Sequence, residues 1–238
     1  MMPAHLALRS GRWLQFQSAT TNVVMDGNSL VYGYRNPGPG NTIAQQLVSQ
    51  STSPLYGSGI TVVNLGVSGQ TWTGMLSGLP VFVAGKTNVL VAWEGTNAIQ
   101  GGRTGAQAVD DAAAYCSAVL ASNAAWKIVH MTCLPRQGGA ATNWGTIAAF
   151  NAQIDAYNTQ LMSEYLAHGA VAVCDVRKSG GVFDMSGDYS NASFEAVNTR
   201  GGAQIWLEAT TGGAIHLTDA GDGVVAGYLA DTLRRVRA

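Results

Sequence analysis

The fold is decided by residues 22–30, which read NVVMDGNSL. The first four residues form a short, mostly apolar run, and the polar and small residues that follow end it at a turn. Similar runs recur further along the chain, at 60–65, 88–93, 127–132 and 170–174. Each is nearly all apolar in its middle, which is the pattern of a strand covered on both faces of a sheet. The sequence therefore predicts five buried strands.

Helical patterns separate these strands. The clearest lies at 143–168, where apolar side chains recur every three or four residues and Gly169 provides a C-terminal stop. A last helix begins near Thr218, a good N-cap residue. Strand and helix alternate from start to finish, so we expect an α/β fold with three α/β/α layers. Its centre would be a flavodoxin-like, doubly wound, five-stranded parallel sheet.

The chain reads as one domain over residues 22–238, because it has no internal repeat and no Pro/Ser-rich linker. Residues 1–21 precede the first strand and are expected to form an N-terminal extension. Residues 176–217 form a long Gly-rich connection, and a connection of that length usually carries function.

Only 11% of the 238 residues are charged, and the formal net charge is −1. Soluble domains average about 25% charged residues. Because the chain offers no basic face, nucleic acid is excluded as a partner. No apolar run approaches the ~18 residues of a membrane-spanning helix, and the first residues lack the pattern of a secretory signal. The compartment and the oligomeric state stay open.

The cysteines and histidines are too scattered for a metal site. Cys116, Cys133 and Cys174 form no C-x-x-C pair, and the four histidines include no H-E-x-x-H motif. We expect buried, unpaired cysteines and a core histidine at His130. No metal and no cofactor is predicted.

Polar residues gather where the strands end. The first strand is followed by Ser29, the second by a Gly-rich turn that contains Gly69, and the third by Asn97. His216 lies in the loop that enters the last helix. Because ligands bind at the carboxyl ends of parallel strands, we expect these four residues at one edge of the sheet. A serine nucleophile, donors for an oxyanion and a histidine base are what acyl transfer requires.

This set of residues resembles the SGNH/GDSL hydrolase family over nearly the whole chain. Residues 27–30, Gly-Asn-Ser-Leu, match the family's GDSL block with Asn28 in place of its aspartate. The resemblance implies a nucleophile that is also the first oxyanion donor, two further donors and a base: Ser29, Gly69, Asn97 and His216, in that order.

One departure from the family pattern concerns the acid that orients the histidine. The family places an aspartate three residues before its histidine, where this chain has Gly213. Loss of such an acid costs on the order of 10⁴ in rate where the geometry is otherwise kept. Three alternatives stay open: a carboxylate from elsewhere, a backbone carbonyl near Gly213, or low activity. Glu208 is the first choice for an outside acid and Asp184 the second.

Several other residues near the strand ends have open roles. Glu94 follows a strand tip and is expected to line the pocket. For Ser29 and Asn97, the plain structural alternative is a helix cap. An apolar or sugar-stacking wall, with ordinary packing as the alternative, is considered for the aromatic residues Tyr32, Tyr34, Trp72, Phe183 and Trp206.

The lead hypothesis is a serine esterase that removes short acyl chains, most simply acetyl, from a carbohydrate or small-molecule ester through an acyl-enzyme intermediate. The short chain is inferred because the sequence has no long apolar lid segment. One alternative, motivated by Gly213, is a non-catalytic or weakly active binding module of a larger assembly. Another is a metal-dependent phosphatase with Asp26 as nucleophile, which leaves Gly69, Asn97 and His216 unexplained.

Overall fold

The structure is a computed structural model of the whole chain. It describes residues 20–33, 42–49, 51–136, 143–177, 199–200, 203–204 and 216–237. Six residues singled out from the sequence lie outside the described residues: Tyr34, Phe183, Asp184, Trp206, Glu208 and Gly213.

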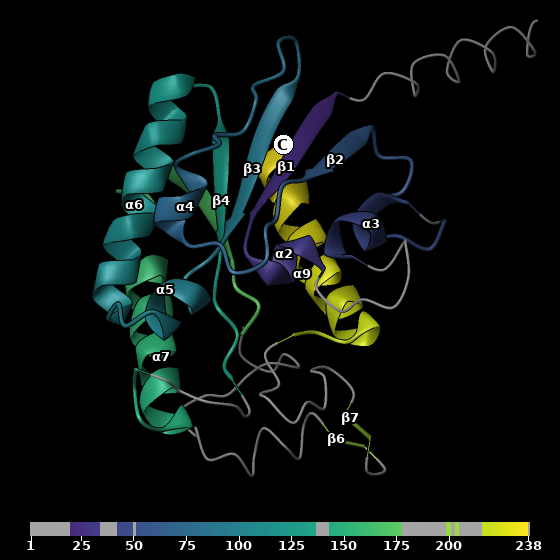
Figure 1. Cartoon of the computed structure of the whole chain (residues 1–238). Helices are drawn as coiled ribbons and strands as arrows, with labels where there is room; N and C mark the ends of the chain where they lie inside the picture. Colours follow the sequence, from purple (N-terminus) through teal and green to yellow (C-terminus); the bar gives the residue numbers. More distant parts are fainter. Residues whose placement is uncertain are drawn as a thin grey trace, which may run out of the picture.

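A five-stranded parallel sheet forms the centre of the molecule (Figure 1). Its strands are β1 (Thr21–Gly27), β2 (Ile60–Asn64), β3 (Thr87–Trp93), β4 (Lys127–Met131) and β5 (Ala170–Cys174). Their spatial order is β2-β1-β3-β4-β5, and every neighbouring pair is parallel. The five predicted strands and the doubly wound topology are therefore confirmed. Two short antiparallel strands, β6 (Thr199–Arg200) and β7 (Ala203–Gln204), form a separate hairpin.

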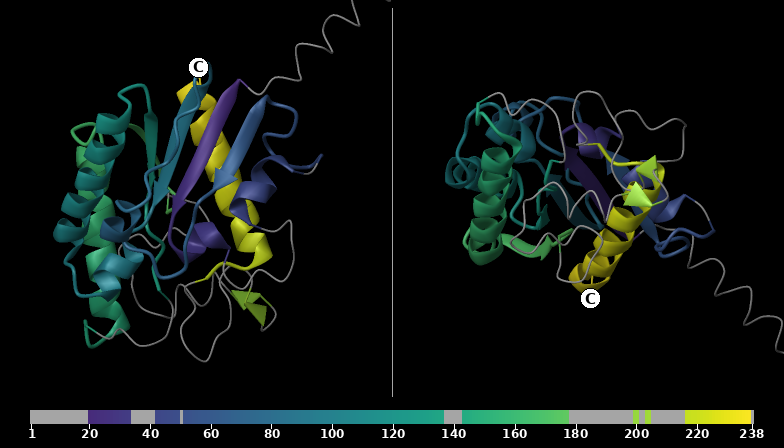
Figure 2. Two further views of the ribbon diagram at one scale, coloured as in Figure 1. Left: turned by 45° about the horizontal axis from the view of Figure 1, so that its top comes forward. Right: turned by 90° about the horizontal axis from the view of Figure 1, so that it is seen from below.

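Helices cover the sheet in two layers, as predicted (Figures 1 and 2). One layer holds α3 (Ile43–Val48) and α9 (Asp219–Arg237), and the short α2 (Ser29–Tyr32) follows β1 directly. The other layer holds α4 (Trp72–Met75), α5 (Thr96–Gln100), α6 (Gly105–Ser122) and α7 (Ile147–Glu164). No helix of the described residues is both long and apolar enough to cross a membrane.

The sheet separates two apolar cores because successive side chains of a strand point to opposite faces. In β1, Val23 and Met25 belong to the core under α3 and α9, whereas Val24 belongs to the core under α4, α6 and α7. All seven residues of β1 are buried. The three cysteines are buried and unpaired, as expected.

Two details differ from the expectations. The outer strand β2 is only partly covered, and Val63 is 43% exposed, because no described helix packs over that side of the sheet edge. The helix expected from residue 143 begins only at Ile147, since Thr146 accepts a hydrogen bond from the Ala149 N–H as its N-cap. The preceding Trp144 instead bonds the Ile99 carbonyl through its indole N–H.

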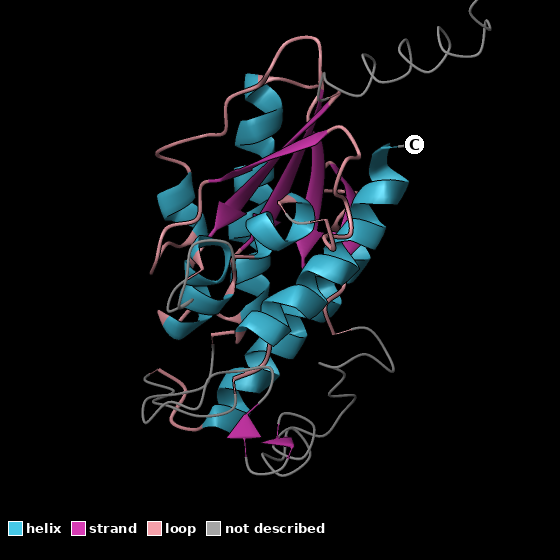
Figure 3. Cartoon of the chain, turned by 90° about the vertical axis from the view of Figure 1, so that its right-hand side faces the viewer, coloured by secondary structure: helices cyan, strands magenta, loops and turns pink. Residues whose placement is uncertain are grey.

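The last helix, α9, runs alongside the sheet (Figure 3). At its start, the Thr218 hydroxyl accepts a hydrogen bond from the Gly221 N–H, which confirms the predicted N-cap. Near its end, the Arg234 and Arg237 guanidinium groups donate to the carbonyls of Pro54 and Ser58, at 2.6 and 2.9 Å.

Candidate active site

The carboxyl ends of β1 and β3 approach each other closely. A Cβ atom on Gly27 would lie 2.2 Å from the Trp93 carbonyl oxygen, so only glycine fits there. The next residue, Asn28, donates its N–H to the same carbonyl at 3.4 Å. This approach places the turn after β1 directly beside Glu94, the first residue after β3.

Asn28, and not Ser29, caps the helix after β1. The Asn28 Oδ1 atom accepts a hydrogen bond from the Leu30 N–H at 2.9 Å. The Ser29 hydroxyl is therefore not used as a cap, and its Oγ lies 3.1 Å from the Nε2 atom of His216. The two residues that the resemblance names as nucleophile and base are thus in hydrogen-bond contact.

The start of α9 positions His216. Leu217, the next residue, is 3% exposed and belongs to the core under α9. Thr218 then caps the helix. A buried side chain and a helix cap follow the histidine immediately, so the backbone at His216 has little freedom to turn its ring away from Ser29.

Gly69 lies in a tight turn after β2. Gly69 has φ +79°, a left-handed conformation that favours glycine, and it lies in a turn closed by a bond from the Gln70 N–H to the Val67 carbonyl. Among the described residues, neither the Gly69 N–H nor the Ser29 N–H donates to another group. Both are available to a substrate oxygen.

Asn97 is tied to this turn. Its Nδ2 donates to the Gln70 carbonyl at 2.9 Å, which leaves the second N–H of the amide for another acceptor. Hydrogen bonds thus join Ser29 to His216 and Asn97 to the turn that contains Gly69. Together they offer a hydroxyl, an imidazole and three N–H donors, the set that acyl transfer uses.

A buried carboxylate lies behind this edge. Glu94 is fully buried, and its Oε2 accepts from the Asn28 side-chain amide at 2.8 Å and from the Asn97 N–H at 3.2 Å. Its Oε1 accepts from the Ala98 N–H at 2.8 Å. Burial raises the pKa of Glu94 to about 7, and these donors act in the opposite direction. The expectation that Glu94 lines the pocket is therefore wrong.

Glu94 turns inward because α5 lacks an ordinary cap. Its N-cap residue is Gly95, which has no side chain to accept the free N–H groups of the first turn. A side chain at Gly95 is excluded, since a Cβ there would lie 2.7 Å from the Cys133 sulfur. The carboxylate of Glu94 caps the helix instead. Sequence reasoning missed this role, although a glycine at an N-cap next to a glutamate was its signal.

Two further residues, Gly66 and Asn64, hold α2 in place, and the sequence analysis did not predict this role. A Cβ on Gly66 would lie 2.3 Å from the Tyr32 backbone nitrogen, so the loop after β2 passes against α2. The Asn64 amide donates to the Val31 carbonyl at 2.7 Å. These contacts fix the short helix that carries Ser29.

Two other sequence-based roles are wrong. Trp72 is 1% exposed and packs against Tyr115 and His130 in the core, so it forms no wall of a pocket. Asp26 is 2% exposed and accepts a hydrogen bond from the Tyr115 hydroxyl, so it cannot act as a phosphatase nucleophile. Tyr32, by contrast, is 54% exposed and is free to contact a ligand.

The three positions considered for orienting His216, namely Glu208, Asp184 and Gly213, lie outside the described residues. The described part of the chain contains no group of three or more His, Cys, Asp or Glu side chains placed to hold a metal ion.

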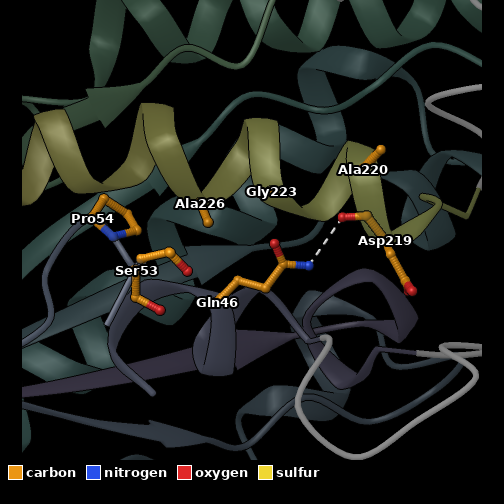
Figure 4. Close-up of a pocket in the computed structure, with 8 residues that line it drawn as sticks. Gln46, Ser53, Pro54, Asp219, Ala220, Gly223 and Ala226 are labelled. Atoms are coloured by element: carbon orange, nitrogen blue, oxygen red, sulfur yellow. Dashed lines mark hydrogen bonds between the residues drawn. The ribbon is translucent and has the colours of Figure 1, made fainter. Parts of the chain in front are cut away.

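A polar groove of about 440 Å³ runs between α3 and α9 (Figure 4). Gln46 lies across it and donates to the Asp219 carbonyl at 3.0 Å. Gly223 faces Gln46, and a Cβ there would lie 2.9 Å from its Oε1. Neither Ser29 nor His216 lines this groove, so it is separate from the Ser29–His216 contact.

Solved structures share this fold. A member of the lipolytic G-D-S-L family from Veillonella parvula is 16% identical, with 90% of this chain and 99% of that chain covered and a TM-score of 0.62. A putative lipolytic G-D-S-L protein from Desulfitobacterium hafniense is 17% identical, with 90% and 98% covered and a TM-score of 0.60. A carbohydrate acetylesterase from Sinorhizobium meliloti is 14% identical, with 91% and 99% covered and a TM-score of 0.58.

Among curated proteins, no sequence relative of this chain is found. The model of the GDSL-like lipase/acylhydrolase family matches residues 27–224, from the glycine before Asn28 into the last helix. The chain belongs to the GDSL-like lipase/acylhydrolase family and is an ester hydrolase.

Proposed function

We propose that the chain is a serine esterase that hydrolyses short-chain esters, most simply acetyl esters, of carbohydrates or small molecules. The observation that carries the proposal is the 3.1 Å contact between Ser29 Oγ and His216 Nε2. A serine hydroxyl is a weak nucleophile until a neighbouring base takes its proton, and histidine is the side chain suited to that near neutral pH.

In the first half of the reaction, Ser29 Oγ attacks the ester carbonyl carbon while His216 accepts the hydroxyl proton. The negative oxygen that forms is stabilised by the N–H groups of Ser29 and Gly69 and by the Asn97 amide. Each such donor contributes on the order of 3 kcal/mol to lowering the barrier. His216 then gives the proton to the leaving alcohol, and the acyl group stays on Ser29.

In the second half, His216 takes a proton from water, which attacks the acyl-serine carbonyl. The same donors stabilise the second negative oxygen, and the carboxylic acid leaves as Ser29 regains its proton. Every step uses groups of this chain and water alone.

The substrate class rests on two weaker supports. The sequence has no long apolar lid segment to cover a long acyl chain. A carbohydrate acetylesterase also shares the fold, which makes acetylated sugars the first substrates to test.

The test is a panel of nitrophenyl esters with acyl chains from acetyl to octanoyl, together with acetylated sugars. We expect turnover that is highest for acetyl and falls with chain length. Ser29→Ala is expected to abolish it, whereas Ser163→Ala, a change at an exposed serine of α7, leaves it unchanged. Equal turnover by Ser29→Ala and the unaltered protein would overturn the proposal.

A further inference from the structure

We propose that Glu94 is a positioning residue that locks the turn carrying the nucleophile to the helix carrying the oxyanion donor, and that Asn28 stands in the GDSL block because this carboxylate already occupies the space facing it. The inference rests on the proposed function of Ser29 and Asn97.

A single oxygen atom of Glu94 joins the two elements. Glu94 Oε2 accepts both from the Asn28 amide, at 2.8 Å, and from the Asn97 N–H, at 3.2 Å. Asn28 directly precedes Ser29 and caps its helix, while Asn97 carries the side-chain donor. A displacement of this oxygen therefore changes the spacing between nucleophile and oxyanion donor, and small errors in that spacing are costly for rate.

Glu94 is itself held firmly. Its backbone carbonyl accepts from the Tyr157 hydroxyl at 2.9 Å and lies 3.5 Å from the Cys133 sulfur. Its other carboxylate oxygen, Oε1, accepts from the Ala98 N–H. Because the side chain has no exposed surface, its position is set by these contacts and not by solvent. It is rigid enough to act as a reference point for both elements.

This arrangement accounts for the departure of the chain from the GDSL pattern. An aspartate at position 28 would place an oxygen where the Asn28 nitrogen now donates to Glu94. Two ionised carboxylates at that separation repel, and one of them must take up a proton to remain. Asparagine keeps the capping oxygen and replaces the second carboxylate oxygen with a donor.

The reciprocal exchange tests this directly. In Asn28→Asp, two carboxyl groups face each other; in Glu94→Gln, a donor can face the Asn28 donor. The double variant Asn28→Asp/Glu94→Gln restores one carboxylate and one amide, with the roles reversed. We expect each single change to lower kcat about tenfold with KM nearly constant, and the double variant to recover most of that loss, because contacting residues couple.

Matched controls separate this pairing from general damage. Asn123→Asp alters an asparagine whose Oδ1 also accepts the N–H two residues on, but which has no hydrogen bond to a carboxylate within the described residues. Glu164→Gln alters a glutamate side chain that is 45% exposed. Both are expected to keep the kcat of the unaltered protein.

The kinetics of these variants distinguish a failure of the Asn28–Glu94 pairing from a failure of the proposed function. A double variant whose loss equals the product of the single losses overturns the inference while Ser29-dependent turnover stands. A protein that turns over no ester overturns the proposed function, and this inference with it. If Glu94→Gln does not fold, the comparison of Asn28→Asp with the double variant decides: recovery of kcat supports the pairing, and its absence rejects it.

Discussion

The side-chain amide of Asn97 is hydrogen-bonded to the backbone carbonyl of Gln70, one residue beyond Gly69. The helix after β3 and the turn after β2 are thereby joined. The bond uses one N–H of the amide and directs the other away from the Gln70 carbonyl.

Asn97→Ala removes that donor and the connection to Gln70. We expect kcat to fall by about 10²–10³ with little change in KM, since the donor acts on the charge that develops in the transition state. Steady-state kinetics on an acetyl ester measure this. Asn143→Ala, which removes another asparagine amide that donates to a backbone carbonyl, serves as the control. A rise in KM at constant kcat would contradict the assigned role.

Gly66→Ala tests the packing of the loop after β2 against α2. The added Cβ would lie 2.3 Å from the Tyr32 nitrogen, so one backbone segment must move. We expect the free energy of unfolding to fall by about 3 kcal/mol, the upper end of the usual cost of overpacking, and turnover to fall with it. Urea denaturation measures the first. Gly78→Ala, where a Cβ meets nothing within 4 Å, should leave both unchanged.

Because His130 is buried, we expect it to lower the free energy of unfolding in acid. It is fully buried, and its pKa is lowered to about 3, first by burial and then by His168. In the unfolded chain it titrates near 6.5, so below that pH the unfolded state binds one more proton than the folded state. The cost that His130 imposes on the folded state is therefore absent above pH 6.5 and grows as pH falls towards 3, by about 1.4 kcal/mol per pH unit and about 5 kcal/mol in all.

His130→Leu removes this dependence. The difference in unfolding free energy between the variant and the unaltered protein should grow in favour of the variant as pH falls from 6.5 to 4.5. Glu94 acts in the opposite sense, because its raised pKa stabilises the folded state as pH falls from about 7 to 4.5. Both proteins contain Glu94, so its effect cancels in the difference between them. Parallel pH profiles for the two proteins would show that His130 takes up a proton within the folded state.

Tyr115→Phe tests the buried partner of Asp26. Burial raises the pKa of Asp26, and the hydrogen bond from the Tyr115 hydroxyl opposes that rise. Without the hydroxyl we expect the unfolding free energy to fall by about 1–3 kcal/mol, because a buried carboxyl group loses its donor. The loss should grow as pH rises through the raised pKa of Asp26, since the ionised form depends on that donor more. Tyr56→Phe, at a tyrosine that is 58% exposed, is the comparison; an equal effect there would refute the argument.

The strands and the edge of the sheet that holds the site could be predicted from sequence because each depends on local signals. Apolar runs identified the strands, and the residues that follow them in a parallel sheet must lie at one edge. The order of the blocks around Ser29, Gly69, Asn97 and His216 then gave the family. The contact of Ser29 with His216 is a geometric result that the sequence implied only by resemblance.

What the sequence could not supply is the direction of individual side chains. Glu94 follows a strand and was expected in the pocket, but the missing cap of α5 turns it inward. For Trp72, which follows a Gly-rich turn, the sequence left a pocket wall and ordinary packing open, and α4 turns it towards Tyr115 in the core. Asn28, not Ser29, caps α2. The outcomes at Glu94 and Asn28 depend on which polar group lacks a partner after the elements have packed, and no periodic pattern records that.

The contact between Ser29 and His216 joins residues 187 positions apart, and the histidine is held by the start of the helix that packs last in chain order. During synthesis, Ser29, Gly69 and Asn97 are added to the chain long before His216. A growing chain that has not yet added and docked α9 has no proton acceptor at Ser29. Ester turnover would thus report that folding is complete, and the recovery of turnover after denaturation would measure the docking of the last helix.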